Sequence, residues 1–354
     1  MKLIITQKQS SNLIKETMGV PKSVDFWVDV LTSLVEDSLL MLLDGGDGSS
    51  LSFSGNEVME KAFSLGWSPD SSGFKELPLV EPSLHVNVNF VPGTTISNGD
   101  DYIQGGNFKT QNTGLSGVKF PNGKEATVLT GGEIEVTLSL PKEHLDDGSI
   151  MEFFNTDIKP YVESLFFHEL THVVEYYNRT INKKTIPGKE LVWLTAGRES
   201  PKNHLEEWDH LIFLIYLHSS FELNARISEI YGLMKGLKIK TKKEFADFLK
   251  SSRVWSYSND LSDFNAEKYY NDIVITDESD TDVKEYVMSA LMERWEEDYN
   301  EMSSENDKLY GTTLPKMGSS TMSKPINFLK FWEKRFNRVG GKAIRKITKL
   351  YSLL

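Results

Sequence analysis

The spacing of apolar and polar residues divides the chain into stretches with different periods. In residues 23–44, apolar positions recur every three or four residues, after a cap candidate at Ser23 and before Gly45-Gly46. This spacing predicts a helix, and residues 1–66 are expected to be mostly helical after a short opening strand. In 85–91 and 133–140 the period becomes two, which predicts half-exposed strands. The glycine-rich stretch between them predicts turns and short hairpin strands.

After Leu145 the pattern is helical again. Asn155 or Thr156 is expected to cap a helix that continues to about Asn178, with Pro160 in its first turn. The polar stretch 179–198 is long enough to be a lid or substrate loop. Further helical regions are expected at about 200–236, 242–252, 283–300 and 324–352, the last interrupted at Gly340-Gly341.

This order of elements predicts an α+β fold: N-terminal helices, a small antiparallel or mixed sheet, and then a mainly helical half. We expect three consecutive regions in the chain. They are an N-terminal helical region (1–80), a core with the sheet and the helices of the candidate site (81–240), and a C-terminal helical region with a basic tail (241–354).

Composition narrows the chemistry. The 354 residues include no cysteine, so a disulfide framework and a thiolate metal site are excluded, and any metal must be held by histidine and carboxylate. Absence of cysteine also favours a reducing, cytoplasmic compartment. No apolar run approaches the ~20 residues of a membrane span, and the N-terminus lacks a signal-peptide pattern. We therefore expect neither a membrane protein nor secretion by a signal peptide.

The charge is unevenly distributed. The chain has a formal net charge of −12, yet residues 324–354 hold nine Lys or Arg residues against the single acid Glu333. An acidic body repels phosphate, which argues against nucleic-acid binding by the protein as a whole. For the basic tail we expect packing of its apolar face on the domain. Docking to nucleic acid, an acidic partner or a membrane surface stays open for this segment alone.

The segment His168-Glu169-Leu170-Thr171-His172 carries the chemistry. Two histidines at i and i+4 stand one turn apart on one helix face, so both imidazoles can reach one cation. Glu169 points to the side of that face, where it can take a proton from a water beside the metal. The alternative is an amphipathic helix whose histidines are satisfied by hydrogen bonds. Because the flanks are apolar, a metal is the more economical partner for three buried polar groups.

At this motif the chain resembles the HExxH zinc metallopeptidases. The metzincin pattern would need a glycine at 175 and a histidine at 178, where this chain has Glu175 and Asn178. In the gluzincin, thermolysin-like branch, the third ligand is a glutamate on a later helix, and the resemblance assigns Glu222 of Glu222-Leu-Asn-Ala225. A carboxylate one turn after the wholly apolar segment 211–217 also calls for a cation. One alternative is an ordinary helix ion pair of Glu222 with Arg226, four residues later. The other is a different third ligand: His210, His218 or Glu229.

Other side chains have two interpretations. His218 is either a donor to the oxyanion of the tetrahedral intermediate, a role that gluzincins give to a histidine or tyrosine, or a core histidine bonded to a carbonyl. Tyr176, Tyr216 and Tyr231 are further oxyanion candidates, each with a core position as the alternative. Glu175 or Glu229 either orients a ligand imidazole or is solvated. The strand 133–140 is expected to pair with an extended substrate.

The resemblance therefore implies a zincin-like core and a zinc-dependent peptidase. It would hold one Zn²⁺ per chain through His168, His172 and Glu222, with Glu169 as general base and His218 as oxyanion donor. Its partner would be a protein or peptide substrate. The alternative is a non-catalytic structural or virion-associated protein with a zinc site. The third-ligand helix and basic tail are similar to those of small phage and microbial proteins, which favours a phage or viral origin, in host cytoplasm or virion.

Overall fold

The computed structural model describes ten ranges of the chain, and everything below concerns these alone: 24–43, 50–66, 79–91, 102–109, 113–119, 125–146, 148–181, 206–218, 220–272 and 324–351. The chain divides into two compact units, which alternate along the sequence. Unit 1 consists of 1–174, 224–246 and 350–354, and unit 2 of 175–223 and 247–349. The sequence had instead predicted three regions that follow one another along the chain.

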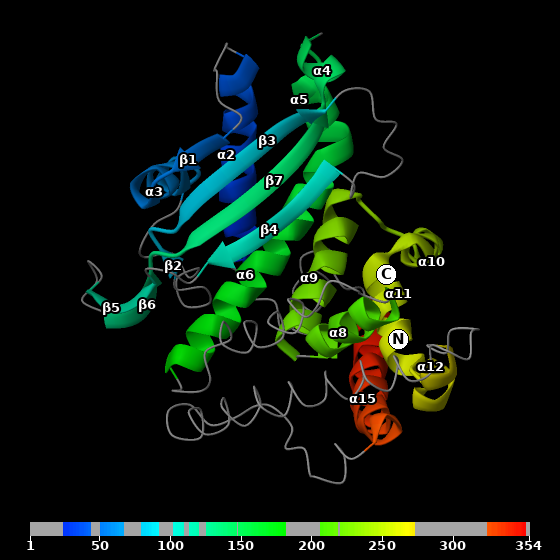
Figure 1. The fold of residues 1–354 in the computed structure, drawn as a ribbon. Coiled ribbons are helices and arrows are strands. Elements are labelled where there is room, and N and C mark those ends of the chain that lie inside the picture. The colour runs from blue at the N-terminus through cyan, green and yellow to red at the C-terminus, as the bar shows by residue number, and fades with distance from the viewer. Residues whose placement is uncertain are drawn as a thin grey trace, which may run out of the picture. The chain divides into compact units, whose positions relative to one another are not determined.

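Unit 1 contains all the described strands (Figure 1). A four-stranded mixed sheet has the order β1 (Ser50–Phe53), β3 (Ser83–Val91), β7 (Glu133–Pro141) and β4 (Ile103–Lys109). The central pair β3–β7 is parallel, and both outer pairs are antiparallel. A second sheet has the order β2 (Leu79–Val80), β6 (Glu125–Thr130) and β5 (Gly114–Lys119). The α+β prediction and its mixed sheet are therefore confirmed.

The period of two separates the faces of the four-stranded sheet. Leu84, Val86 and Val88 of β3 are buried, and so are Ile134, Val136 and Leu138 of β7. The alternate residues form a polar row across the other face, in which His85 contacts both Ser52 and Glu133. Helices α2 (Val24–Leu43) and α6 (Lys159–Ile181) cover the apolar face (Figure 1). This arrangement places α6, which carries the two histidines, directly under the sheet.

The strand 133–140 does not lie where the substrate-pairing hypothesis needs it. As β7, it pairs with β3 along one side and with β4 along the other, so its backbone groups are already used within the sheet. That prediction was wrong. The sequence showed the alternation of this strand, which is typical of any half-buried strand, but could not show its place in the strand order.

The start of the histidine helix also differs from the prediction. A short helix α5 (Ile150–Phe153) and a π-helical turn η3 (Phe154–Ile158) come directly before α6. Asn155 and Thr156, expected as caps, lie inside this continuous helical segment and donate to the carbonyls of Met151 and Glu152, four residues back. Small polar residues often bond the preceding turn in this way, which resembles a cap in sequence.

The remaining helices of unit 1 flank the sheet. A capping box at Ser54 and Glu57 begins α3 (Gly55–Ser64), and the short α4 (Lys142–Asp146) follows β7. The region 1–66 thus contains a strand, β1, that was expected to be helical. Helix α9 (Ser220–Gly236) is part of unit 1 from Asn224 to its end.

Unit 2 is helical in its described part. Its elements are α8 (Glu206–His218), α11 (Arg253–Asp263), α12 (Ala266–Asp272), most of α15 (Pro325–Tyr351) and the second half of α10 (Lys242–Ser251), with the end of α6 and the start of α9. The apolar face of α15 is buried through residues that include Phe328, Trp332 and Phe336. Across both units, no described helix is long and apolar enough to cross a membrane. The expected opening strand, the 283–300 helix and most of the 179–198 loop lie outside the described residues.

Helix α15 continues through Gly340-Gly341, where a break was expected. A β-carbon at Gly340 would lie 2.4 Å from the Ser262 nitrogen and 2.7 Å from the Ser258 carbonyl oxygen, both on α11. Gly340 is thus required by the close approach of two helices. At Gly341, the nearest neighbour of an added β-carbon would be the Arg345 guanidinium at 3.7 Å.

These two glycines give a matched test of the fold. We expect Gly340→Ala to lower the free energy of unfolding by about 1–3 kcal/mol, because the new methyl group meets backbone atoms. We expect Gly341→Ala to raise it by about 0.5–1 kcal/mol, since alanine is the better helix former. Urea unfolding followed by circular dichroism measures both changes. Equal effects of the two substitutions would contradict the packing described here.

Candidate metal centre

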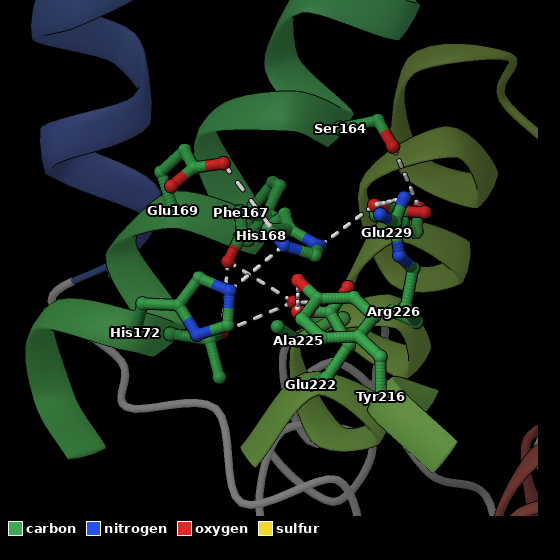
Figure 2. A network of polar contacts seen from close by, with 12 residues as sticks. Ser164, Phe167, His168, Glu169, His172, Tyr216, Glu222, Ala225, Arg226 and Glu229 are labelled. Atoms are coloured by element: carbon green, nitrogen blue, oxygen red, sulfur yellow. Dashed lines mark hydrogen bonds and ion pairs between the residues drawn. The ribbon is translucent and has the colours of Figure 1, made fainter. Parts of the chain in front are cut away.

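The two histidines of α6 point their rings at a common position. His168 and His172 lie one helical turn apart, and their side chains are buried, with residue exposures of 4% and 8%. Their Nε2 atoms are 2.8 Å apart (Figure 2). The two rings therefore converge, as the spacing of four residues on one helix predicts.

Glu222 completes the group. One carboxylate oxygen of Glu222 and one nitrogen of each histidine all lie within 4.8 Å of one another. Glu222 is in the first turn of α9 and is fully buried. The three residues that the sequence singled out as metal ligands thus lie together in the structure. Two imidazoles and one carboxylate are a common donor set for zinc, with room for a fourth ligand.

Small residues on α9 let this helix approach α6 closely. A β-carbon at Gly232 would lie 2.8 Å from the Ser164 Cα, and one at Gly236 would lie 2.7 Å from the Pro160 Cβ. Ala225 and Ser228 continue the same stripe toward Glu222, and both are fully buried. The helix backbone can approach this closely only where side chains are small, so this stripe sets the position of α9 on α6.

Hydroxyl groups join the two helices beside the histidines. Ser228 donates to the Phe167 carbonyl at 3.0 Å, and Thr171 contacts Ser228 with an Oγ1–Oγ distance of 3.0 Å. Both side chains are buried, so these bonds satisfy polar groups that would otherwise be costly. They lie on the turns that carry His168 and His172, and they fix the register between α6 and α9.

Glu229 holds the far side of the first histidine. Its Oε1 lies 2.7 Å from the His168 Nδ1 and 3.0 Å from the Arg226 Nη1 (Figure 2). A carboxylate at Nδ1 favours the tautomer that keeps a proton there, which leaves Nε2 bare as a ligand atom. Of the two roles considered for Glu229, the structure supports the orienting one.

Glu169 lies beside the group without belonging to it. Its side chain is buried, with 4% of the residue exposed, and its Oε1 is 3.9 Å from the His168 Nε2. In Figure 2 it extends to the side of the ring pair. A buried carboxylate this close to the ligand nitrogen can accept a proton from a molecule bound there.

The residues present fit a zinc ion. Two nitrogens bound tetrahedrally to one zinc at the usual distance are about 3.3 Å apart, so the observed 2.8 Å needs only a small opening of the rings. All three donors are buried, and all are of the kind that zinc accepts. Without a cation, a carboxylate and two imidazoles would share a desolvated position, which is costly unless they are paired.

The other candidates for a site role lie elsewhere or have other partners. The His218 ring packs edge-to-face on Trp332 of α15, with 5.0 Å between centroids, and has a hydrogen bond to the backbone of Ile215. This is the environment of a core histidine, and His218 is not a member of the metal-binding group. His210 is exposed. Tyr216, for which the sequence offered an oxyanion role or a core position, donates to Glu222.

Comparisons with protein-family models, curated proteins and solved structures found no significant match to this chain. The likeness to gluzincins therefore consists of the HExxH motif and the spaced glutamate. The function has to be argued from the side chains themselves.

We expect the purified protein to bind about one zinc per chain. Loss of any of the three ligands should weaken zinc binding more than loss of Glu229, which orients one of them. Glu229→Gln should weaken binding by roughly 10–100-fold, as is typical when the partner of a ligand histidine is lost. His168→Ala, His172→Ala and Glu222→Ala should each cost more than that. Competition with a chromophoric chelator measures the affinities, and His85→Ala, in the polar row of the sheet, is the control. Equal zinc content in all five variants would refute the site.

His218 predicts a pH dependence of stability. Its pKa is lowered to about 4, mainly by burial; the hydrogen bond to Ile215 raises the pKa, and the charges of Arg335 and Arg338 lower it. Since the unfolded chain binds the proton more readily, His218 should reduce the free energy of unfolding as pH falls from about 6.5 to about 4. His218→Phe keeps a ring against Trp332 and should remove this part of the pH dependence. Denaturation at several pH values, compared between the two proteins, measures it.

Proposed function

We propose that the protein is a zinc-dependent peptidase, an amide hydrolase in which His168, His172 and Glu222 hold one zinc ion. The observation that supports this proposal best is Glu169. A metal site with a purely structural role gains nothing from an additional buried carboxylate 3.9 Å from a ligand nitrogen. Keeping such a group desolvated is costly, and its position suits proton transfer.

The chemistry follows from the positions of these side chains. Zinc in this position would act as a Lewis acid, which lowers the pKa of water to ~7 and polarises a carbonyl group. Glu169 accepts the proton of the attacking water as the new carbon–oxygen bond forms. It then donates this proton to the amide nitrogen as the carbon–nitrogen bond breaks. Glu229 keeps the His168 ring in the orientation and tautomer that this requires.

Strand β4 supports an extended peptide as the substrate. It ends the order of the four-stranded sheet, and among the described strands only β7 pairs with it. A β-carbon at Gly106 of β4 would lie 2.5 Å from the Leu165 side chain, so β4 lies directly on α6. Leu165 is one turn before His168. A peptide that adds to the outer edge of β4 would therefore pass beside the histidines.

The test of this proposal is Glu169→Gln. The substitution keeps the size of the side chain but removes the base, so we expect the zinc content to stay unchanged and peptide cleavage to fall by roughly 10²–10⁴-fold. Cleavage of casein by the zinc-loaded protein is the assay. Glu163→Gln is the matched control, because Glu163 is a partly buried carboxylate of the same helix, six residues before Glu169, and lies outside the metal-binding group.

One result would count against the peptidase, and another against the role of Glu169. If the wild type binds zinc and cleaves neither casein nor its candidate protein partners, the site is structural. If Glu169→Gln cleaves as fast as the wild type, another residue is the base.

A further inference from the structure

The hydroxyl of Tyr216 is bonded to the third carboxylate of the metal-binding group. It donates to the Glu222 Oε2 at 2.5 Å (Figure 2). Tyr216 lies in the last turn of α8, and Glu222 lies in the first turn of α9. Glu222 is fully buried, so this bond is made in a desolvated environment, where hydrogen bonds to a carboxylate are strong.

A carboxylate can bind a metal through one oxygen or through both. The choice matters here, because a second oxygen would occupy coordination space that a water and a substrate carbonyl need. A donor on Oε2 competes with a metal for that oxygen, which favours metal binding through the other one. It also stops the carboxylate from rotating about its terminal bond.

We propose that Tyr216 is a positioning residue that makes Glu222 a one-oxygen metal ligand through Oε1. This inference rests on the proposed metal site, but it does not depend on the reaction. It assigns the hydroxyl of Tyr216 to the ligand, whereas the gluzincin resemblance would assign a tyrosine to the oxyanion. The two roles differ in what they control: the first controls metal affinity and coordination, the second only the rate of the chemical step.

The ring of Tyr216 has a separate, structural role. It lies tilted against Phe213, with 6.4 Å between centroids. Tyr216→Phe therefore removes one oxygen atom and keeps this contact. Tyr257 of α11 is a matched control, because its ring contacts the same Phe213 at 4.9 Å.

The experiment compares wild type, Tyr216→Phe and Tyr257→Phe, each loaded with zinc and, separately, with Co²⁺. We expect Tyr216→Phe to bind zinc roughly 10–100-fold more weakly, as when the hydrogen-bond partner of a ligand is lost. The visible absorption of its Co²⁺ form should weaken and shift toward that of a higher coordination number, since Glu222 is free to bind with both oxygens. Tyr257→Phe should match the wild type in both measurements.

The outcomes separate this inference from the peptidase proposal. Unchanged zinc affinity and an unchanged Co²⁺ spectrum in Tyr216→Phe would overturn the positioning role, and a lower kcat in the same variant would assign its hydroxyl to the oxyanion. A wild type that binds metal but cleaves no peptide would end the peptidase proposal, while the Tyr216 measurements would still decide the positioning role. A wild type that binds no metal would overturn both.

Discussion

The close packing of α9 on α6 is the constraint on which the site depends. The histidines lie on one helix and the glutamate on another, so the spacing between the two helix axes decides whether three side chains can share one cation. Gly232 and Gly236 allow the backbones to approach, and the Ser228 hydroxyl fixes their register through the Phe167 carbonyl. A larger residue in this stripe would separate the ligands although none of them had changed. The relative positions of the three candidate ligands are therefore set by residues that carry no charge.

Around this contact, the buried polar groups form a connected set. His168 has Glu229 at one ring nitrogen and His172 at the other, and Glu222 is bonded to Tyr216. Each partner restricts the rotation of a side chain that would have to meet a metal. Such pre-organisation reduces the entropy that metal binding would otherwise cost. These hydrogen bonds and ion pairs also explain how His168, His172 and Glu222 can stay buried where little water reaches them.

The sequence predicted most of the elements and the identity of the clustered residues. The helix at 24–43, the strands β3 and β7, and the pair His168 and His172 followed from local periods. Glu222 followed from the resemblance to gluzincins, supported by the cost of a buried carboxylate. What failed depends on contacts distant in sequence. The central place of β7 follows from β4 pairing with it, and the continuity of α15 at Gly340 follows from α11. The stripe of small residues on α9 was visible in the sequence, but only the packed partner gives it meaning.

The contact of Glu229 makes the two histidines chemically different from each other. With the His168 proton held at Nδ1, the Nε2 atom of this ring can only accept. The hydrogen bond between the two Nε2 atoms then takes its proton from His172. A cation bound to both Nε2 atoms would replace this hydrogen bond, and the neutral His172 ring would then carry its proton on Nδ1 instead. The two histidines of the motif would therefore meet a metal differently, because His168 already has the required tautomer and His172 has to change its own.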